Sequence, residues 1–144
     1  MTRNVQTRGD IYDSAKRSEI MSRIRGADTK PELLLRSLLH RLGFRFRVHR
    51  KDLPGHPDIV LPKYHTAVFV HGCFWHQHPR CRRATVPATR RDWWKAKFKR
   101  NAARDVEVRR NLDAMGWNSI VIWECELRNP QAVAVSLKRR LRRR

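Results

Sequence analysis

Three cysteines and one histidine have the spacing of a metal site. His78 follows Cys73 after four residues, Cys81 follows after two more, and Cys125 lies far downstream. Thiolates and imidazole are the ligands that a tetrahedral structural zinc ion takes. Because the set uses every cysteine of the chain, the pattern predicts a zinc ion that staples a loop too polar to fold alone. His76 lies in the same loop and could replace His78, and three ordinary buried cysteines would be the plainer interpretation.

One carboxylate and two histidines have the chemistry of phosphodiester hydrolysis. Asp58 stands at the start of an apolar run, and a carboxylate at a strand end suits Mg²⁺, with a backbone carbonyl of the next strand as a further ligand. Such a cation binds the phosphate and lowers the pKa of the attacking water. A histidine side chain ordinarily titrates near neutrality, so His71 or His76 could exchange a proton with water. By itself, Pro57-Asp58 is more typical of a turn, and the histidines could equally be zinc ligands or loop residues.

Charge and aromatic residues favour a nucleic-acid partner. The 144 residues hold 33 Lys+Arg against 13 Asp+Glu, a net charge of +20. The densest basic run, residues 80–110, contains Trp93-Trp94 and follows Phe74-Trp75; exposed aromatics beside Arg can wedge between bases or stack on them. A membrane surface is the weaker alternative, because the basic residues 138–144 are too few and too charged for an anchoring helix. We expect neither an export signal nor a membrane span, and hence a reducing cytosol.

The elements that must position these residues follow from hydrophobic periodicity. Thr29-Lys-Pro-Glu32 is a capping-box pattern, and leucines on one face predict a helix that Gly43 ends. Asp92 is expected to cap a long helix that Gly116 closes. The other expected elements are a helix over 14–25, strands over 44–48, 58–61, 66–70 and 118–124, a functional loop over 72–91, and a final helix from Pro130.

Five short motifs resemble the very short patch repair endonucleases. They are Phe69–His76 (FVHGCFWH), Val86–Arg90 (VPATR), Trp123-Glu-Cys125, Pro54–Asp58 (PGHPD), and Lys16-Arg-Ser18 with Met21 in an N-terminal arm. The likeness runs from about Ser14 to Leu127. It implies an α/β fold with a restriction-endonuclease-like core of the PD-(D/E)XK type: a mixed central sheet flanked by helices, with a structural zinc. We expect residues 1–13 to form a flexible arm, 14–137 a single endonuclease domain, and 138–144 a basic tail.

The resemblance also implies a reaction and its residues. The reaction is a Mg²⁺-dependent nick 5′ to the T of a T:G mismatch, which arises by deamination of 5-methylcytosine, usually within CC(A/T)GG. Asp58 and the Val70 carbonyl would hold Mg²⁺, with His76 as the base, His71 ordering the hydrated metal, and Glu32 supporting the site. The zinc ligands would be Cys73, His78, Cys81 and Cys125. The residues that enter the DNA would be Phe74, Trp75 and Trp94, with Met21 and Ile24 approaching from the other groove.

Several features depart from the family pattern or leave rivals open. Val70 stands where Thr is common, and Pro79-Arg80 lengthens the loop before Cys81 by one residue.

The resemblance implies a bacterial cytoplasmic, nucleoid-associated monomer that acts on double-stranded DNA beside a cytosine methyltransferase and mismatch repair proteins, with no membrane partner. The rival functions are an endonuclease with a restriction-type duplex specificity and a non-catalytic zinc module that binds nucleic acid.

Overall fold

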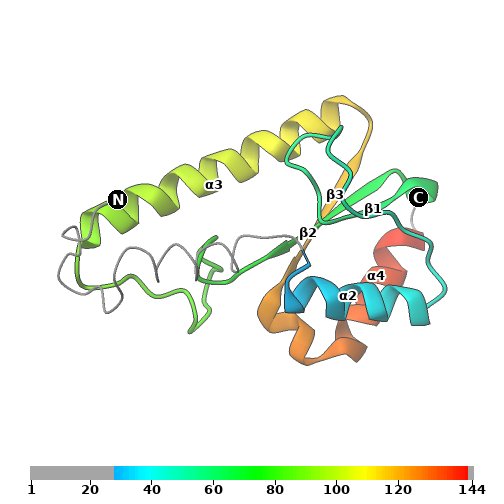
Figure 1. The fold of residues 1–144 in the computed structure, drawn as a ribbon, viewed down its shortest axis with the longest axis horizontal. Coiled ribbons are helices and arrows are strands. Elements are labelled where there is room, and N and C mark those ends of the chain that lie inside the picture. Colours follow the sequence, from blue (N-terminus) through cyan, green and yellow to red (C-terminus); the bar gives the residue numbers. More distant parts are fainter. Residues whose placement is uncertain (1–27, 143–144) are drawn as a thin grey trace.

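A computed structural model describes residues 28–142, and Figure 1 shows how their elements are arranged. Three strands form a mixed sheet, β1 (Ile59–Leu61), β2 (Thr66–His71) and β3 (Asn118–Trp123). The central strand β2 pairs antiparallel with β1 and parallel with β3, with Val68 opposite both Ile59 and Ile120. The predicted α/β class and the central position of the Thr66 strand are therefore confirmed.

The helix that carries Glu32 begins as its capping pattern predicts. α2 (Lys30–Arg41) has Thr29 as its N-cap, whose hydroxyl accepts a hydrogen bond from the Glu32 N–H at 3.4 Å. The Glu32 carboxylate in turn accepts hydrogen bonds from the Asp28 N–H at 3.0 Å and the Thr29 hydroxyl at 3.2 Å. These bonds satisfy the free donors of the first turn and fix the direction of the Glu32 side chain.

Side-chain alternation along the strands gives the sheet two apolar faces. Ile59, Leu61 and Val68 face a larger core that is completed by α2 and by α4 (Pro130–Arg142). Val60 and Ala67 face a smaller core with Leu112 of α3 (Arg91–Ala114). Figure 1 shows the resulting layers, with the long helix α3 on one side of the sheet and α2 and α4 on the other.

Two expected elements differ from the structure. Residues 44–48 do alternate between half-buried Phe44, Phe46 and Val48 and exposed arginines, but their only bridge within the described chain joins Arg47 to Val60. The reason is that β1 stops at Leu61, where Pro62 begins a short 3-10 helix and leaves little edge to pair with. Asp92 is not the cap of α3, so that prediction is wrong: the N-cap is Arg90, and Asp92 lies in the first turn, where its charge still suits the helix dipole.

The expected basic tail over residues 138–144 is helical as far as Arg142. Val133, Leu137 and Leu141 of α4 are buried at four-residue intervals, so the helix continues through the basic residues from Lys138 to Arg142. The expected arm, the helix over 14–25, and Met21 and Ile24 lie outside the described residues. Within residues 28–142, every helix is too short or too polar to cross a membrane.

Candidate functional site

A cavity of about 310 Å³ opens between the sheet and α3. From the strands and the loop after β2 it is lined by Asp58, Val70, His71 and His76, four of the residues predicted to act on a phosphodiester. From α3 it is lined by Arg104, Asp105 and Arg109, among others. The structure therefore brings the predicted acid, both histidines and Val70 to one concave surface.

Asp58 is held at the junction of β1 and β2 beside a second carboxyl group. Its Oδ2 accepts a hydrogen bond of 2.6 Å from the Val70 N–H. Burial raises the pKa of Asp58 to about 7, and the neighbouring Glu32 carboxyl adds to the increase, although the Val70 N–H opposes it. Glu32 is only 7% exposed. A half-buried carboxyl beside a buried one is a site with affinity for a cation.

The two histidines of the cavity differ in their partners. Their rings stack with centroids 3.8 Å apart and an interplanar angle of 4°. His76 Nδ1 lies 2.8 Å from Asp105 Oδ2, whereas the buried His71 Nδ1 has no hydrogen-bond partner among residues 28–142. Burial, followed by repulsion from His76, lowers the pKa of His71 to about 4, so His71 is neutral near pH 7. His76 is the histidine with an acid to orient it.

Asp105 is the residue of this site that sequence reasoning missed. It lies 29 residues beyond His76 on a helix rich in Lys and Arg, where an isolated acid looks like part of a solvated face. No local pattern in the sequence marks Asp105; in the structure it lies one turn after Asn101, whose Nδ2 donates to the Trp75 carbonyl at 2.9 Å. Both residues share the helix face that meets the loop after β2.

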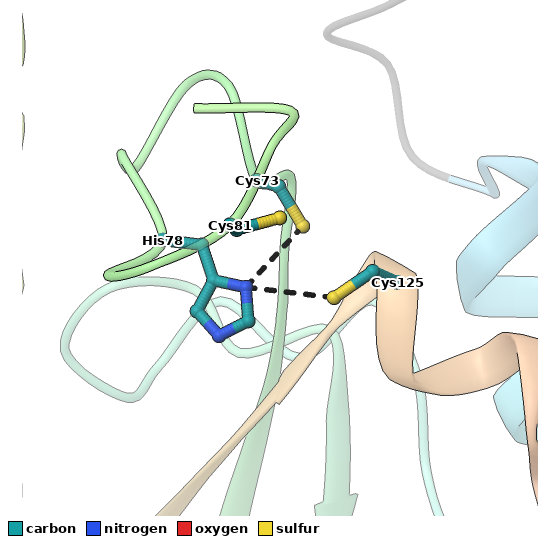
Figure 2. A group of neighbouring side chains, drawn as sticks. All are labelled: Cys73, His78, Cys81 and Cys125. Atoms are coloured by element: carbon teal, nitrogen blue, oxygen red, sulfur yellow. Dashed lines mark hydrogen bonds between the residues drawn. The ribbon is translucent and has the colours of Figure 1, made fainter. Parts of the chain in front are cut away.

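The Cys/His set forms a second cluster, which Figure 2 shows. The ligand atoms of Cys73, His78, Cys81 and Cys125 all lie within 4.8 Å of one another. His78 Nδ1 lies 3.7 Å from Cys73 Sγ and 3.5 Å from Cys125 Sγ. Burial raises the pKa of the Cys73 thiol to about 12. The cluster could hold a metal ion, and such an ion would favour the thiolate form of Cys73 that burial disfavours.

The backbone decides which histidine joins the cysteines. Gln77 adopts a left-handed conformation with φ 49°, and its Nε2 donates to the carbonyls of Phe74 at 2.8 Å and Thr85 at 3.2 Å. This turn sends His76 toward Asp105 and His78 toward the cysteines. The choice between the two imidazoles, open from the sequence, therefore falls on His78.

Trp123 stands between the two clusters. Its ring stacks on His78 with centroids 4.1 Å apart and meets the His71 ring edge-on at 5.2 Å. Trp123 is half-buried and covers one face of the His78 ring. Next to it, Glu124 Oε1 accepts a hydrogen bond from the Cys73 N–H at 3.0 Å, which ties the two segments that supply the cysteines.

The aromatic residues predicted to enter DNA lie together. The Phe74 ring meets Trp75 at 5.1 Å, Trp94 at 5.4 Å and Phe98 at 5.2 Å, each edge-on. Phe74, Trp75 and Trp94 are half-buried, whereas Trp93 is 44% exposed beneath the Arg90 guanidinium. The cluster joins the loop after β2 to the start of α3.

Several known proteins are similar in sequence to this chain over most of its length. Residues 9–83 match the family described as DNA mismatch endonuclease Vsr. The type II nicking enzyme V.XorIIP of Xanthomonas oryzae pv. oryzae is 47% identical over 90% of this chain and 94% of its own length. V.NmeAIP of Neisseria meningitidis serogroup A, also a type II nicking enzyme, is 43% identical over 92% and 94%. The DNA mismatch endonuclease Vsr of Escherichia coli is 44% identical over 83% and 76%.

Proposed function

Because this chain belongs to the Vsr family of DNA mismatch endonucleases and is a DNA endonuclease, we propose that it nicks duplex DNA 5′ to the T of a T:G mismatch. Such mismatches arise by deamination of 5-methylcytosine, and the nick would start a very short repair tract. The observation that carries the proposal is the cavity in which Asp58, His71 and the His76–Asp105 pair meet. The mixed sheet with carboxyl groups at one edge also supports a core of the restriction-endonuclease, PD-(D/E)XK type.

The carboxyl pair fits the Mg²⁺ expected for this reaction. Oxygen ligands are those that Mg²⁺ prefers, and it needs few of them from the protein. Asp58 and the Val70 carbonyl would hold the ion, and Glu32 would orient its waters. Bound there, Mg²⁺ supplies charge neutralisation at the phosphate and a lower pKa of the attacking water. The raised pKa of Asp58 supports this assignment, because burial and the neighbouring Glu32 carboxyl disfavour the charged form, which a bound cation would favour.

The proton of the attacking water would pass to His76. Asp105 holds the His76 ring by its Nδ1 and would leave Nε2 to face the water. Water oxygen attacks phosphorus, one P–O ester bond breaks, and the leaving oxygen takes a proton from solvent, so that a hydroxyl and a phosphate end remain. His71, uncharged near neutral pH, would hydrogen-bond the phosphate or a water rather than accept the proton.

The second cluster fits a structural Zn²⁺. Tetrahedral ligands at zinc–sulfur and zinc–nitrogen distances lie about 3.5–3.8 Å apart. The separations of His78 Nδ1 from Cys73 and Cys125 Sγ, 3.7 and 3.5 Å, match this spacing. All four positions of the tetrahedron would be filled by side chains, which is typical of structural rather than catalytic zinc.

The aromatic cluster would enter the duplex beside the mismatch. Phe74, Trp75 and Trp94 lie on the loop that carries His76 and on the helix that carries Asp105, so insertion would position the strand relative to the cavity. A T:G step costs less to unstack than a matched one, which would make insertion selective. We expect Trp75→Ala to weaken binding to T:G duplex more than to matched duplex; equal losses would assign Trp75 to packing.

A second candidate keeps the endonuclease and changes its specificity. Several relatives are named type II nicking enzymes, so a restriction-type duplex site without a mismatch is the strongest rival. A non-catalytic zinc module is the other rival. We further propose that the protein acts as a monomer at the bacterial nucleoid, beside a cytosine methyltransferase and mismatch repair proteins.

A gel nicking assay tests the proposal. Labelled duplexes carry T:G, T:A or C:G in the CC(A/T)GG context, with Mg²⁺ or without added divalent cation. A nick only 5′ to the mismatched T that needs Mg²⁺ would support reaction, substrate and strand choice together. Cleavage of the matched duplexes would favour the restriction-type rival. Binding without any cleavage, also on a T:G library with randomised flanks, would favour the non-catalytic module.

A further inference from the structure

One face of α3 forms a wall of the cavity. Its lining residues are spaced by three and four positions, as on a single helix face, and they are Asn101, Arg104, Asp105, Val108 and Arg109. Three of the five have contacts that hold the wall in place. Asn101 binds the Trp75 carbonyl, Asp105 binds His76, and Val108 packs so closely that a Cβ on Gly55 would lie 2.5 Å from its Cγ1.

The two arginines of this wall differ from the other three residues, because no ion pair within residues 28–142 holds their side chains. Among residues 28–142, neither Arg104 nor Arg109 has a carboxylate within ion-pair distance, and both side chains are exposed. Some arginines elsewhere in the described chain do pair with acids, as Arg36 does with Asp28 at 2.6 Å. Within residues 28–142, no carboxylate therefore occupies the guanidinium donors of the two cavity arginines, and a ligand could bind them.

Arg109 and His71 both line the cavity. Arg109 follows Asp105 by one helical turn, Asp105 contacts His76, and the His76 ring stacks on the ring of His71. His71 follows Val70 directly on β2, and the Val70 N–H binds Asp58. A phosphate that reaches Asp58 and His71 would thus come within range of Arg109.

We propose that Arg109 binds the phosphodiester that enters this cavity, as a further catalytic residue of the reaction proposed above. The inference rests on that proposed function. A phosphodiester carries one negative charge, and attack by water adds charge to its non-bridging oxygens. A guanidinium presents a planar fork of N–H donors that matches two such oxygens. Asp58, Glu32 and Asp105 are acidic and would repel the phosphate, so a fixed cation on the opposite element offsets this repulsion.

The neighbouring arginine provides a matched control. Arg110 has the same charge, lies on the same helix and is also exposed, but it does not line the cavity. If Arg109 only adds to the overall positive charge of the protein, Arg109→Ala and Arg110→Ala should weaken DNA binding alike. If Arg109 contacts one particular phosphate, the effect of its loss must depend on the charge of that phosphate.

The test combines these variants with uncharged DNA phosphates. The zinc-loaded full chain binds three T:G duplexes in Ca²⁺ in place of Mg²⁺: an unmodified duplex, one with a methylphosphonate at the scissile position, and one with a methylphosphonate five nucleotides away. We expect Arg109→Ala to raise the Kd of the unmodified and distant-modified duplexes by about ten- to a hundredfold. On the scissile methylphosphonate its effect should fall to about twofold or less. Arg110→Ala should have one small effect on all three.

Activity gives an independent readout. In Mg²⁺, single-turnover nicking should slow in Arg109→Ala and recover in part in Arg109→Lys, which restores charge without the fork. A loss of binding that is the same on all three duplexes, or a shifted pH profile without any phosphate dependence, would overturn the inference. The methylphosphonate dependence requires no cutting and can be repeated on matched duplex. The phosphate contact of Arg109 can therefore be confirmed even if the protein does not nick T:G duplex. It can also be ruled out even if the protein does nick T:G duplex.

Discussion

The two side-chain clusters that meet at Trp123 are stabilised in opposite ways. The metal cluster brings together three thiols and one imidazole, whose ligand atoms suit a single cation. The cavity brings together groups that disfavour one another: burial beside Glu32 raises the pKa of Asp58, and burial beside His76 lowers the pKa of His71. With a bound cation, the Cys/His cluster would stabilise the fold. The residues of the cavity, in contrast, are held together by the fold. With a metal ion bound, the Cys/His cluster would fix the loop after β2, and the cavity could then hold unfavourable charges.

The largest expected effect is a loss of nicking when the cavity is changed and the Cys/His cluster is left intact. Asp58→Ala should reduce nicking by about a thousandfold or more, because the proposed Mg²⁺ ligand is lost. Its melting temperature and zinc content should not fall, because a buried carboxyl that repels Glu32 is removed. Single-turnover nicking, thermal melting and metal analysis measure these effects. Asp113→Ala, an exposed acid at the end of α3, is the control. Retained cleavage in Asp58→Ala would rule out the proposed role of this residue.

The next effect concerns the metal cluster and should appear mainly in stability. Cys125→Ser removes the one ligand supplied from beyond β3. We expect loss of zinc and a free energy of unfolding lower by about 3 kcal/mol or more, because the metal no longer joins two distant segments. Metal analysis and urea unfolding, with Ser136→Ala of α4 as control, measure both. One equivalent of zinc with unchanged stability would show that Cys125 is not a ligand.

A smaller effect tests how the cavity orients its base. Asp105→Asn keeps the shape of the side chain but removes its charge and an acceptor oxygen for His76. Nicking should slow by about ten- to a hundredfold, with little change in melting temperature or zinc content. Glu107→Gln, an exposed acid two residues along α3, is the matched control and should nick normally. If both variants nick at the wild-type rate, Asp105 does not position His76 during the reaction.

The smallest effect is on the pH dependence of stability without added Mg²⁺. Folding raises the pKa of Asp58 from 3.8 to about 7, so its contribution is present at low pH and is lost as pH rises through this range. Folding lowers the pKa of His71 from 6.5 to about 4, so its contribution is lost as pH falls from 6.5 to 4. In the wild type the two trends oppose each other.

Two variants should separate these trends. In Asp58→Asn, the free energy of unfolding should rise with pH between about 4 and 6.5, because only His71 remains. In His71→Asn it should fall with pH between about 4 and 7, because only Asp58 remains. Urea unfolding at a series of pH values measures both slopes. The same slope in the wild type and in both variants would contradict the opposed pKa shifts.

Periodic and local signals predicted most of the fold. The Thr29–Glu32 cap, the leucine face of α2, the three strands and the end of α3 before Gly116 were all readable, because each depends on residues within a few positions of one another. The errors have tertiary causes. Residues 44–48 form only one bridge because β1 is short, and α3 begins at Arg91 rather than at an Asp92 cap.

The candidate site was predictable in its members but not in its pairings. Composition and spacing singled out the three cysteines, and the family motifs singled out Asp58, His71 and His76; the roles of these residues stay predictions. Asp105 carried no local signal, because its partner lies 29 residues away. Only the packing of α3 over the loop brings them to 2.8 Å.

The sequence by itself determined the types of chemistry that this protein contains: a strongly basic chain, one set of soft metal ligands, and an acid with two histidines close to strand ends. The tertiary structure decided how that chemistry is divided. His76 and His78 are the same residue type two positions apart, and the left-handed turn at Gln77 sends one to the cavity and the other to the cysteines. It also decided the charge states, because a pKa depends on burial and on neighbouring charges, which are properties of the folded chain rather than of residue order.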